Sequence, residues 1–146
     1  MISNRMKRNR FFSDIIDEKG QKMLTGNSLR ILSVGVGILL LFYGVDKVMN
    51  GIDFIVTLLR DHHIPYPEYL AYGVYIGEVV APLMLIMGRN VPLAGALIAI
   101  DMIVAIWLVH SDHLFEIVDS GAWSIELPML YLLIGVTLAS TYKPKS

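Results

Sequence analysis

The sequence predicts an all-α membrane protein: a bundle of four transmembrane helices with a short amphipathic interfacial helix between helices 1 and 2. The 146 residues are 55% hydrophobic and only 17% charged, whereas a typical soluble domain carries about 25% charged residues. Four apolar segments approach the roughly 20 residues that a helix needs to cross a bilayer. They lack the strict alternation of a barrel strand, so a helical bundle is the fold class that we expect.

The four predicted spans lie at residues 31–49, 69–88, 91–110 and 123–142. Only Arg89 and Asn90 separate the second span from the third, and Pro92 suits the first turn of a helix. These two helices should therefore form a tight antiparallel hairpin.

The distribution of basic residues predicts the orientation of the bundle. Of the twelve Lys and Arg residues, seven lie in residues 1–30, one is Arg89 and two follow the fourth span. By the positive-inside rule, both termini are then cytoplasmic. We therefore divide the chain into a basic N-terminal tail (1–29), a four-helix domain (30–142) and a short cytoplasmic tail (143–146). For the N-terminal tail, a second amphipathic helix and disorder both remain open.

The loop after the first span is predicted to contain the amphipathic helix. Ile52, Ile55 and Leu59 recur at helical spacing, and Pro65 ends the pattern. We expect this helix to lie on the outer membrane interface.

Small residues four positions apart predict where the helices pack closely. A Gly or Ala lets a neighbouring backbone approach, so we expect these positions to face other helices. They are Gly73, Gly77 and Ala81 in the second span, Gly95 and Ala99 in the third, and Gly135 and Ala139 in the fourth.

Two acidic residues, Glu78 and Asp101, lie near the middle of the second and third predicted spans. A charge at the bilayer centre costs about 2.5–3.5 kcal/mol on insertion scales, so both side chains should face protein. Adjacent antiparallel helices place them at equal depth, and if they meet they would share one proton near neutral pH. The pair would then transfer a proton, hold a polar ligand or only lock the bundle, and the sequence leaves these roles open.

A second group of polar residues lies toward the predicted outer ends of the helices. We expect these residues and the two central acids to line one polar pocket that opens to the outer face. Lys47 would balance Asp46, Glu126 or a bound anion, with snorkelling of its ammonium group to the interface as the alternative. The predicted pocket residues are Tyr43, Lys47, Tyr75, Glu78, Asp101, His110 and Glu126.

The composition excludes several kinds of chemistry. Because the chain has no cysteine, disulfide exchange, thiolate catalysis, Cys-ligated zinc, iron–sulfur clusters and covalent haem attachment are ruled out. The four histidines and the acids near them are spaced too loosely to predict a metal site, so none is predicted. A net charge of −1 gives no reason to expect binding to nucleic acid.

Short motifs stand in a fixed order along the chain. They are residues 39–47 (LLLFYGVDK), 63–67 (HIPYP), Gly77-Glu78 followed by residues 87–89 (MGR), residues 104–110 (VAIWLVH) and residues 121–123 (GAW). On these motifs, the chain from Arg30 to about Tyr142 resembles the DoxX family of membrane proteins. By position, Lys47, Glu78 and His110 match the polar positions of that family, whereas Asp101 has no assigned counterpart.

The resemblance implies a four-helix integral protein of the bacterial inner (cytoplasmic) membrane. Relatives include membrane subunits linked to thiosulfate:quinone oxidoreduction, and others tied to oxidative-stress complexes or protein maturation. We therefore expect a membrane subunit of an oxidoreductase system, with a partner subunit and a polar pocket for quinone or proton handling. No intrinsic cofactor is predicted, a quinone is the expected bound molecule, and catalytic activity stays open. The alternatives are a small carrier or binding protein for an anionic or lipid-like solute, and a scaffold or assembly factor; a homo-oligomer is compatible with each.

Overall fold

The computed structural model describes residues 2–110, 115–117 and 121–141, with side chains from Gly26 onward except that of His110. The chain forms two compact units, Met1–Leu32 and Ser33–Ser146. In the described residues, all regular structure is helical apart from one antiparallel bridge between Ile117 and Trp123. The all-α class is therefore confirmed.

Helix α1 (Ile2–Asn50) starts well before the first predicted span. The apolar pattern starts near residue 31, but the residues before it include good helix formers such as Arg, Lys, Gln and Met. Because the chain has no proline before Pro65, nothing in the sequence breaks the helix. Its apolar part, Gly26–Asn50, is long enough to cross a membrane. The helix ends where Gly51 adopts a left-handed conformation with φ of 88°, as is common after a helix C-terminus.

Helix α2 (Asp53–Asp61) is the predicted amphipathic helix, and its existence is confirmed. Its apolar face packs on protein, since Ile52 and Leu59 join Ala71 and Leu108 in one buried cluster. Phe54 points elsewhere and is exposed. The helix therefore covers one end of the bundle.

The second predicted span is a continuous helical segment with irregular winding. It runs through α3 (Pro67–Leu70), a 3₁₀ turn (Ala71–Gly73), a π turn (Ile76–Val80) and α4 (Ala81–Met87). In a regular α-helix the ring of Pro82 would clash with the carbonyl group four residues earlier, which belongs to Glu78. The wider π winding before Pro82 removes this clash. The segment Pro67–Met87 is the second candidate membrane span.

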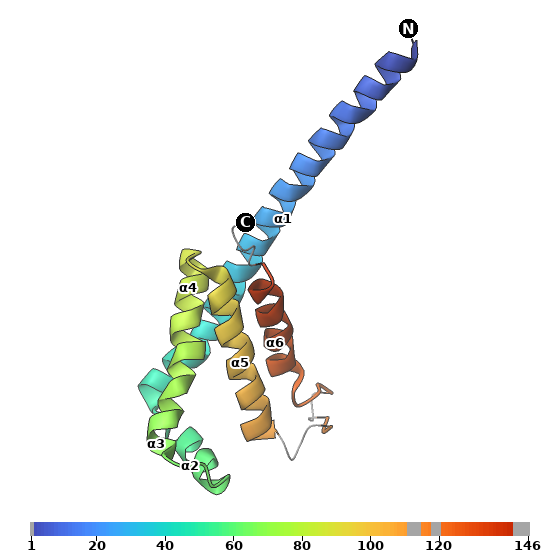
Figure 1. The fold of residues 1–146 in the computed structure, drawn as a ribbon. Helices are drawn as coiled ribbons and strands as arrows, with labels where there is room; N and C mark the ends of the chain where they lie inside the picture. The colour runs from blue at the N-terminus through green and yellow to red at the C-terminus, as the bar shows by residue number, and fades with distance from the viewer. Residues whose placement is uncertain (1, 111–114, 118–120, 142–146) are drawn as a thin grey trace. The chain divides into compact units, whose positions relative to one another are not determined.

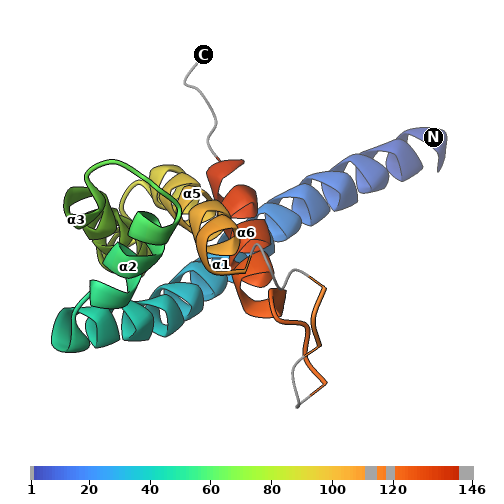
Figure 2. The same ribbon diagram turned by 90° about the horizontal axis from the view of Figure 1, so that it is seen from below.

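Helix α5 (Val91–His110) has the predicted bounds and contains the third candidate span, Val91–Val109. A tight turn joins it to α4, with Gly88 and Asn90 at positive φ. This confirms the predicted hairpin. In both views α5 lies between the segment of α3 and α4 on one side and α6 on the other (Figure 1, Figure 2).

Helix α6 (Glu126–Ala139) is shorter than the predicted fourth span. Its 14 residues extend about 21 Å, less than the roughly 30 Å thickness of a bilayer core. The sequence predicts that this span starts at Trp123, but Trp123 pairs with Ile117 in the antiparallel bridge and precedes the helix. The structure thus has three long apolar candidate spans and a shorter apolar helix, and a fourth crossing stays a prediction.

Close helix packing follows the small residues, with one exception. A Cβ atom on Gly95 would lie 2.7 Å from the carbonyl oxygen of Gly135, and one on Gly135 would lie 2.9 Å from the backbone nitrogen of Ala99. These residues therefore hold α5 and α6 in backbone contact, as predicted. Gly73 was predicted to pack in the same way, but no atom lies within 4 Å of a Cβ placed there. The reason is that Gly73 borders a cavity and not another helix.

Candidate functional site

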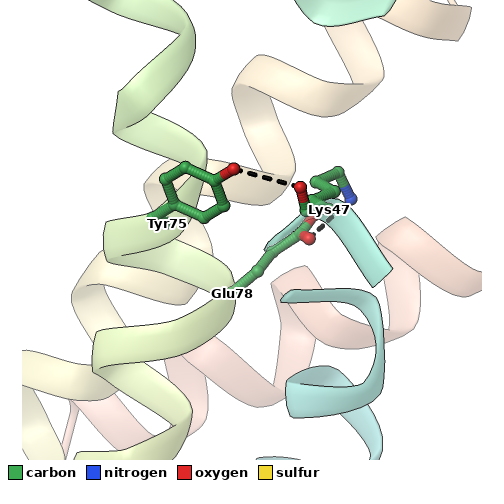
Figure 3. Close-up of polar contacts among 3 residues, drawn as sticks. All are labelled: Lys47, Tyr75 and Glu78. Carbon is green, nitrogen blue, oxygen red and sulfur yellow. Dashed lines mark hydrogen bonds and ion pairs between the residues drawn. The ribbon is translucent and has the colours of Figure 1, made fainter. Parts of the chain in front are cut away.

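An ion pair joins α1 to the π turn of the second span. Lys47 Nζ donates a hydrogen bond to Glu78 Oε2 at 2.5 Å, and the two side chains are 24% and 9% exposed. The hydroxyl group of Tyr75 donates to the backbone carbonyl oxygen of Lys47 at 3.0 Å. Figure 3 shows both contacts. The end of α1 is thus tied to the second span by two polar contacts, one of them charged.

Gly44 makes this pairing sterically feasible. It lies one turn before Lys47, and a Cβ atom placed on it would overlap the carbonyl oxygen of Glu78. That carbonyl lies four residues before Pro82, which has no N–H group to bond it. Gly44 and Pro82 therefore both affect the carbonyl group of Glu78: Gly44 leaves room for it beside α1, and Pro82 does not bond to it.

Asp101 lies on α5 and packs against Gly77, the residue before Glu78. A Cβ atom on Gly77 would overlap the side-chain carboxyl group of Asp101. Asp101 Oδ2 is buried and has no hydrogen-bond partner among the described residues. A buried polar atom without a partner costs about 1–3 kcal/mol, so in a native protein it commonly marks a ligand, ion or water position.

The sequence predicts that the two central acids would share a proton if their side chains met, and in the described part of the chain no hydrogen bond joins them. Glu78 Oε2 binds Lys47 instead. Equal depth was not enough to pair them, because the π turn directs Glu78 toward α1 while Asp101 faces the backbone of Gly77.

Lys47, Glu78 and Asp101 line one cavity of about 840 Å³. This volume lies within the range of about 300–1,000 Å³ that is typical of small-molecule sites. The cavity is bounded by the end of α1, by α2, by the second span and by α5, and its walls are mainly apolar. Its other charged or amide side chains are Asp46, Asn50 and Asp53.

The other predicted pocket residues lie outside this cavity wall or outside the described side chains. The exposed ring of Tyr43 lies 5.9 Å from Lys47 Nζ, in cation–π range. Tyr75 holds the backbone of α1, as described above. Glu126 is exposed in the first turn of α6, and the described cavity wall includes no residue of α6. His110 ends α5, but its side chain is outside the described residues.

Asp46 and Glu126, the two acids predicted to balance Lys47, do not pair with it in the described part of the chain, and a bound anion stays a prediction. Asp46 accepts a hydrogen bond from Asn50 Nδ2 at 2.6 Å, while Lys47 pairs with Glu78. Successive residues on a helix point in directions about 100° apart, so Asp46 and Lys47 face different neighbours. Among the described side chains, no group of three His, Asp or Glu residues is placed to hold a metal ion.

The family model named DoxX matches residues 28–111, more than half of the chain. The chain belongs to the DoxX family. The match includes the three long candidate spans from residue 28 onward, and with them Lys47, Glu78 and Asp101. No curated protein and no solved structure matches the chain. Family membership and the apolar helices together make this an integral membrane protein with several spans.

Within this DoxX-family chain, two of the polar positions that the resemblance assigned by motif, Lys47 and Glu78, are in direct contact. Sequence reasoning missed the roles of Gly44 and Asn50, since neither carries a charge that lipid would reject. The sequence did contain a signal for the π turn: Pro82 lies inside the second span, and a proline there predicts a local break at the carbonyl group four residues earlier, which belongs to Glu78.

Proposed function

We propose that this DoxX-family protein is a membrane subunit of an oxidoreductase system and that it binds a quinone in the cavity at Asp101. One observation carries the proposal: a mainly apolar cavity lined by the candidate spans contains a charged pair and a carboxyl oxygen that has no hydrogen-bond partner among the described residues. An apolar cavity with a few polar groups is typical of sites for lipid-soluble ligands.

The polar groups of the cavity suit the chemistry of a quinone. The carbonyl oxygens of a quinone only accept hydrogen bonds, and both the ammonium group of Lys47 and a protonated Asp101 donate them. Reduction of a quinone to a quinol takes up two electrons and two protons. Asp101 and Glu78 are the acids at the cavity that would exchange protons, and a partner oxidoreductase subunit would supply the electrons by oxidising its own substrate.

A lipid-soluble ligand has a route into this cavity. Ile76, Ile100 and Val104 line it and are also exposed on the surface of the isolated chain. All three belong to membrane-spanning segments, so in a bilayer these exposed side chains face lipid or another protein. A quinone could therefore reach Asp101 sideways from the membrane.

The cavity is less suited to an anionic solute, which was one of the alternatives. Lys47 is already paired with Glu78, and the remaining acids of the wall are Asp46, Asp53 and Asp101. An anion would therefore meet a wall whose formal charge is negative. A neutral lipid-like solute and a scaffold without any ligand are the alternatives that an experiment has to separate from a quinone.

The test is binding of decylubiquinone to the purified full-length chain in lipid nanodiscs, with mass spectrometry of co-purified quinone as a second readout. Asp101→Leu should weaken binding about tenfold, because it removes one hydrogen bond to the ligand. Asp101→Asn keeps an N–H donor and should bind nearly as well as the natural chain. Asp61→Asn changes an exposed acid of α2 that lies outside the described cavity wall and should have no effect.

Equal binding by the natural chain and Asp101→Leu would contradict the proposed site. If the natural chain neither retains a quinone nor binds decylubiquinone, the quinone proposal fails. A retained lipid of another class would then identify a binding protein for a lipid-like solute, and a clean chain would favour the scaffold.

A further inference from the structure

The cavity at Asp101 has a polar, exposed rim at one end. Asp46, Asn50, Gly51 and Asp53 line it where α1 meets α2, and all four are exposed. Asn50 Nδ2 donates a hydrogen bond to Asp46 Oδ1 at 2.6 Å. This contact fixes two rim side chains to each other, and both stay exposed to solvent. Water and small ions can therefore reach the cavity from the end of the bundle that carries α2.

The structure is closed on the opposite side of Asp101. Leu40, Leu85, Ile98 and Leu138 are fully buried there and come from four different helices. From Asp101 to the start of α5 at Val91 the helix extends about 15 Å. Along this stretch Gly95 brings α5 into backbone contact with α6. Close-packed protein interiors contain few voids large enough for water. The described residues therefore provide no aqueous route from this end.

The charges around the cavity favour cations. Four carboxyl groups, of Asp46, Asp53, Glu78 and Asp101, line it with one ammonium group, of Lys47. Because Glu78 neutralises Lys47, the two exposed aspartates, Asp46 and Asp53, leave the cavity with a negative charge even when Asp101 is protonated. A cleft lined by one sign of charge raises the local concentration of the opposite ion by about tenfold or more.

Asp101 Oδ2 supplies an independent reason to expect water in this cavity. It is buried and has no hydrogen-bond partner among the described residues, although the cavity beside it is large and partly polar. Water occupies a cavity when there is room for it and when polar groups can bind it. A water molecule arriving from the rim would satisfy this oxygen.

We infer that the cavity is a one-sided aqueous vestibule, which connects Asp101 with the compartment on the α2 side and admits cations in preference to anions. Asp101 then exchanges protons with that compartment alone. The inference of a vestibule does not depend on which ligand the cavity binds. Its consequence for quinone chemistry rests on the proposed function: the protons of the reaction would enter or leave on the α2 side.

Accessibility of single cysteines tests this sidedness directly, because the chain has no cysteine of its own. Full-length variants are reconstituted in vesicles and treated from one side at a time with membrane-impermeant methanethiosulfonates. Asp61→Cys in α2 and Ser140→Cys after α6 are both at exposed positions and report the two ends of the bundle. Ala105→Cys lines the cavity and keeps Asp101 in place, whereas Ile98→Cys lies in the closed part.

Ala105→Cys should react only from the side that modifies Asp61→Cys, and Ile98→Cys should react from neither side. The rate ratio between a trimethylammonium reagent and a sulfonate reagent should be about tenfold higher at Ala105→Cys than at Asp61→Cys. Adding Asp53→Asn to the Ala105→Cys chain should lower that ratio.

Three results would overturn the inference. They are reaction of Ala105→Cys from the side that modifies Ser140→Cys, no reaction from either side, and equal reagent ratios at Ala105→Cys and Asp61→Cys. The vesicles contain no quinone, so these outcomes are separate from those of the binding experiment. Added decylubiquinone should slow the modification of Ala105→Cys if the proposed function is also correct, and should leave it unchanged if only the vestibule exists.

Discussion

The ion pair between Lys47 and Glu78 should contribute measurably to stability because it is largely removed from solvent. Lys47→Met leaves the carboxylate of Glu78, which is 9% exposed, without its cation. Breaking a buried pair in this way costs about 3–5 kcal/mol, and the 24% exposure of Lys47 places the expected loss near the lower limit, about 3 kcal/mol. Glu78→Gln removes the other charge. In the double variant no charge is left unpaired, so its loss should be about 2 kcal/mol smaller than the sum of the single losses.

The measurement is a double-mutant cycle on the free energy of unfolding of the full chain in mixed micelles. The matched control is the ion pair between Arg60 and Glu68, with Nη2 and Oε1 2.8 Å apart and side chains 64% and 60% exposed. Exposed pairs contribute little, so Arg60→Met and Glu68→Gln should be additive within error. Losses that are additive for Lys47→Met and Glu78→Gln as well would refute the reasoning, since burial would then give the pair no advantage.

Two further predictions concern the backbone around this pair. Gly44→Ala should destabilise the chain by about 1–3 kcal/mol, because its Cβ would overlap the carbonyl oxygen of Glu78. Gly35→Ala, which meets no atom within 4 Å, should be neutral or stabilising, and unfolding measurements that give equal effects for the two variants would contradict the proposed contact. Pro82→Ala restores the N–H group that a regular helix needs, so Glu78 should rotate away from Lys47. The coupling energy between these two residues should then fall, and a repeat of the double-mutant cycle in this background with undiminished coupling would show that the π turn does not orient Glu78.

The sequence alone was sufficient to predict the three long candidate spans and the hairpin. Their signal is local: an uninterrupted apolar stretch has to be helical in lipid, because each backbone N–H and C=O group must find its partner within the segment. The bounds of α5 and the existence of α2 followed from this reasoning. The same reasoning left helix and disorder open for residues 1–29, where α1 extends through polar residues. It was wrong at Trp123, where the predicted fourth span starts with an antiparallel bridge instead of a helix.

Only the tertiary structure decided which polar groups meet. Depth in the bilayer singled out Glu78 and Asp101, but depth says nothing about the direction in which a side chain points. That direction depends on the π turn before Pro82 and on the close approach of Gly44, which together bring Glu78 to Lys47 and leave Asp101 against Gly77. These contacts join residues far apart in the sequence. The hydrophobic periodicity of one helix gives no information about the crossing angle or the rotation of the neighbouring helices, so it cannot predict such contacts.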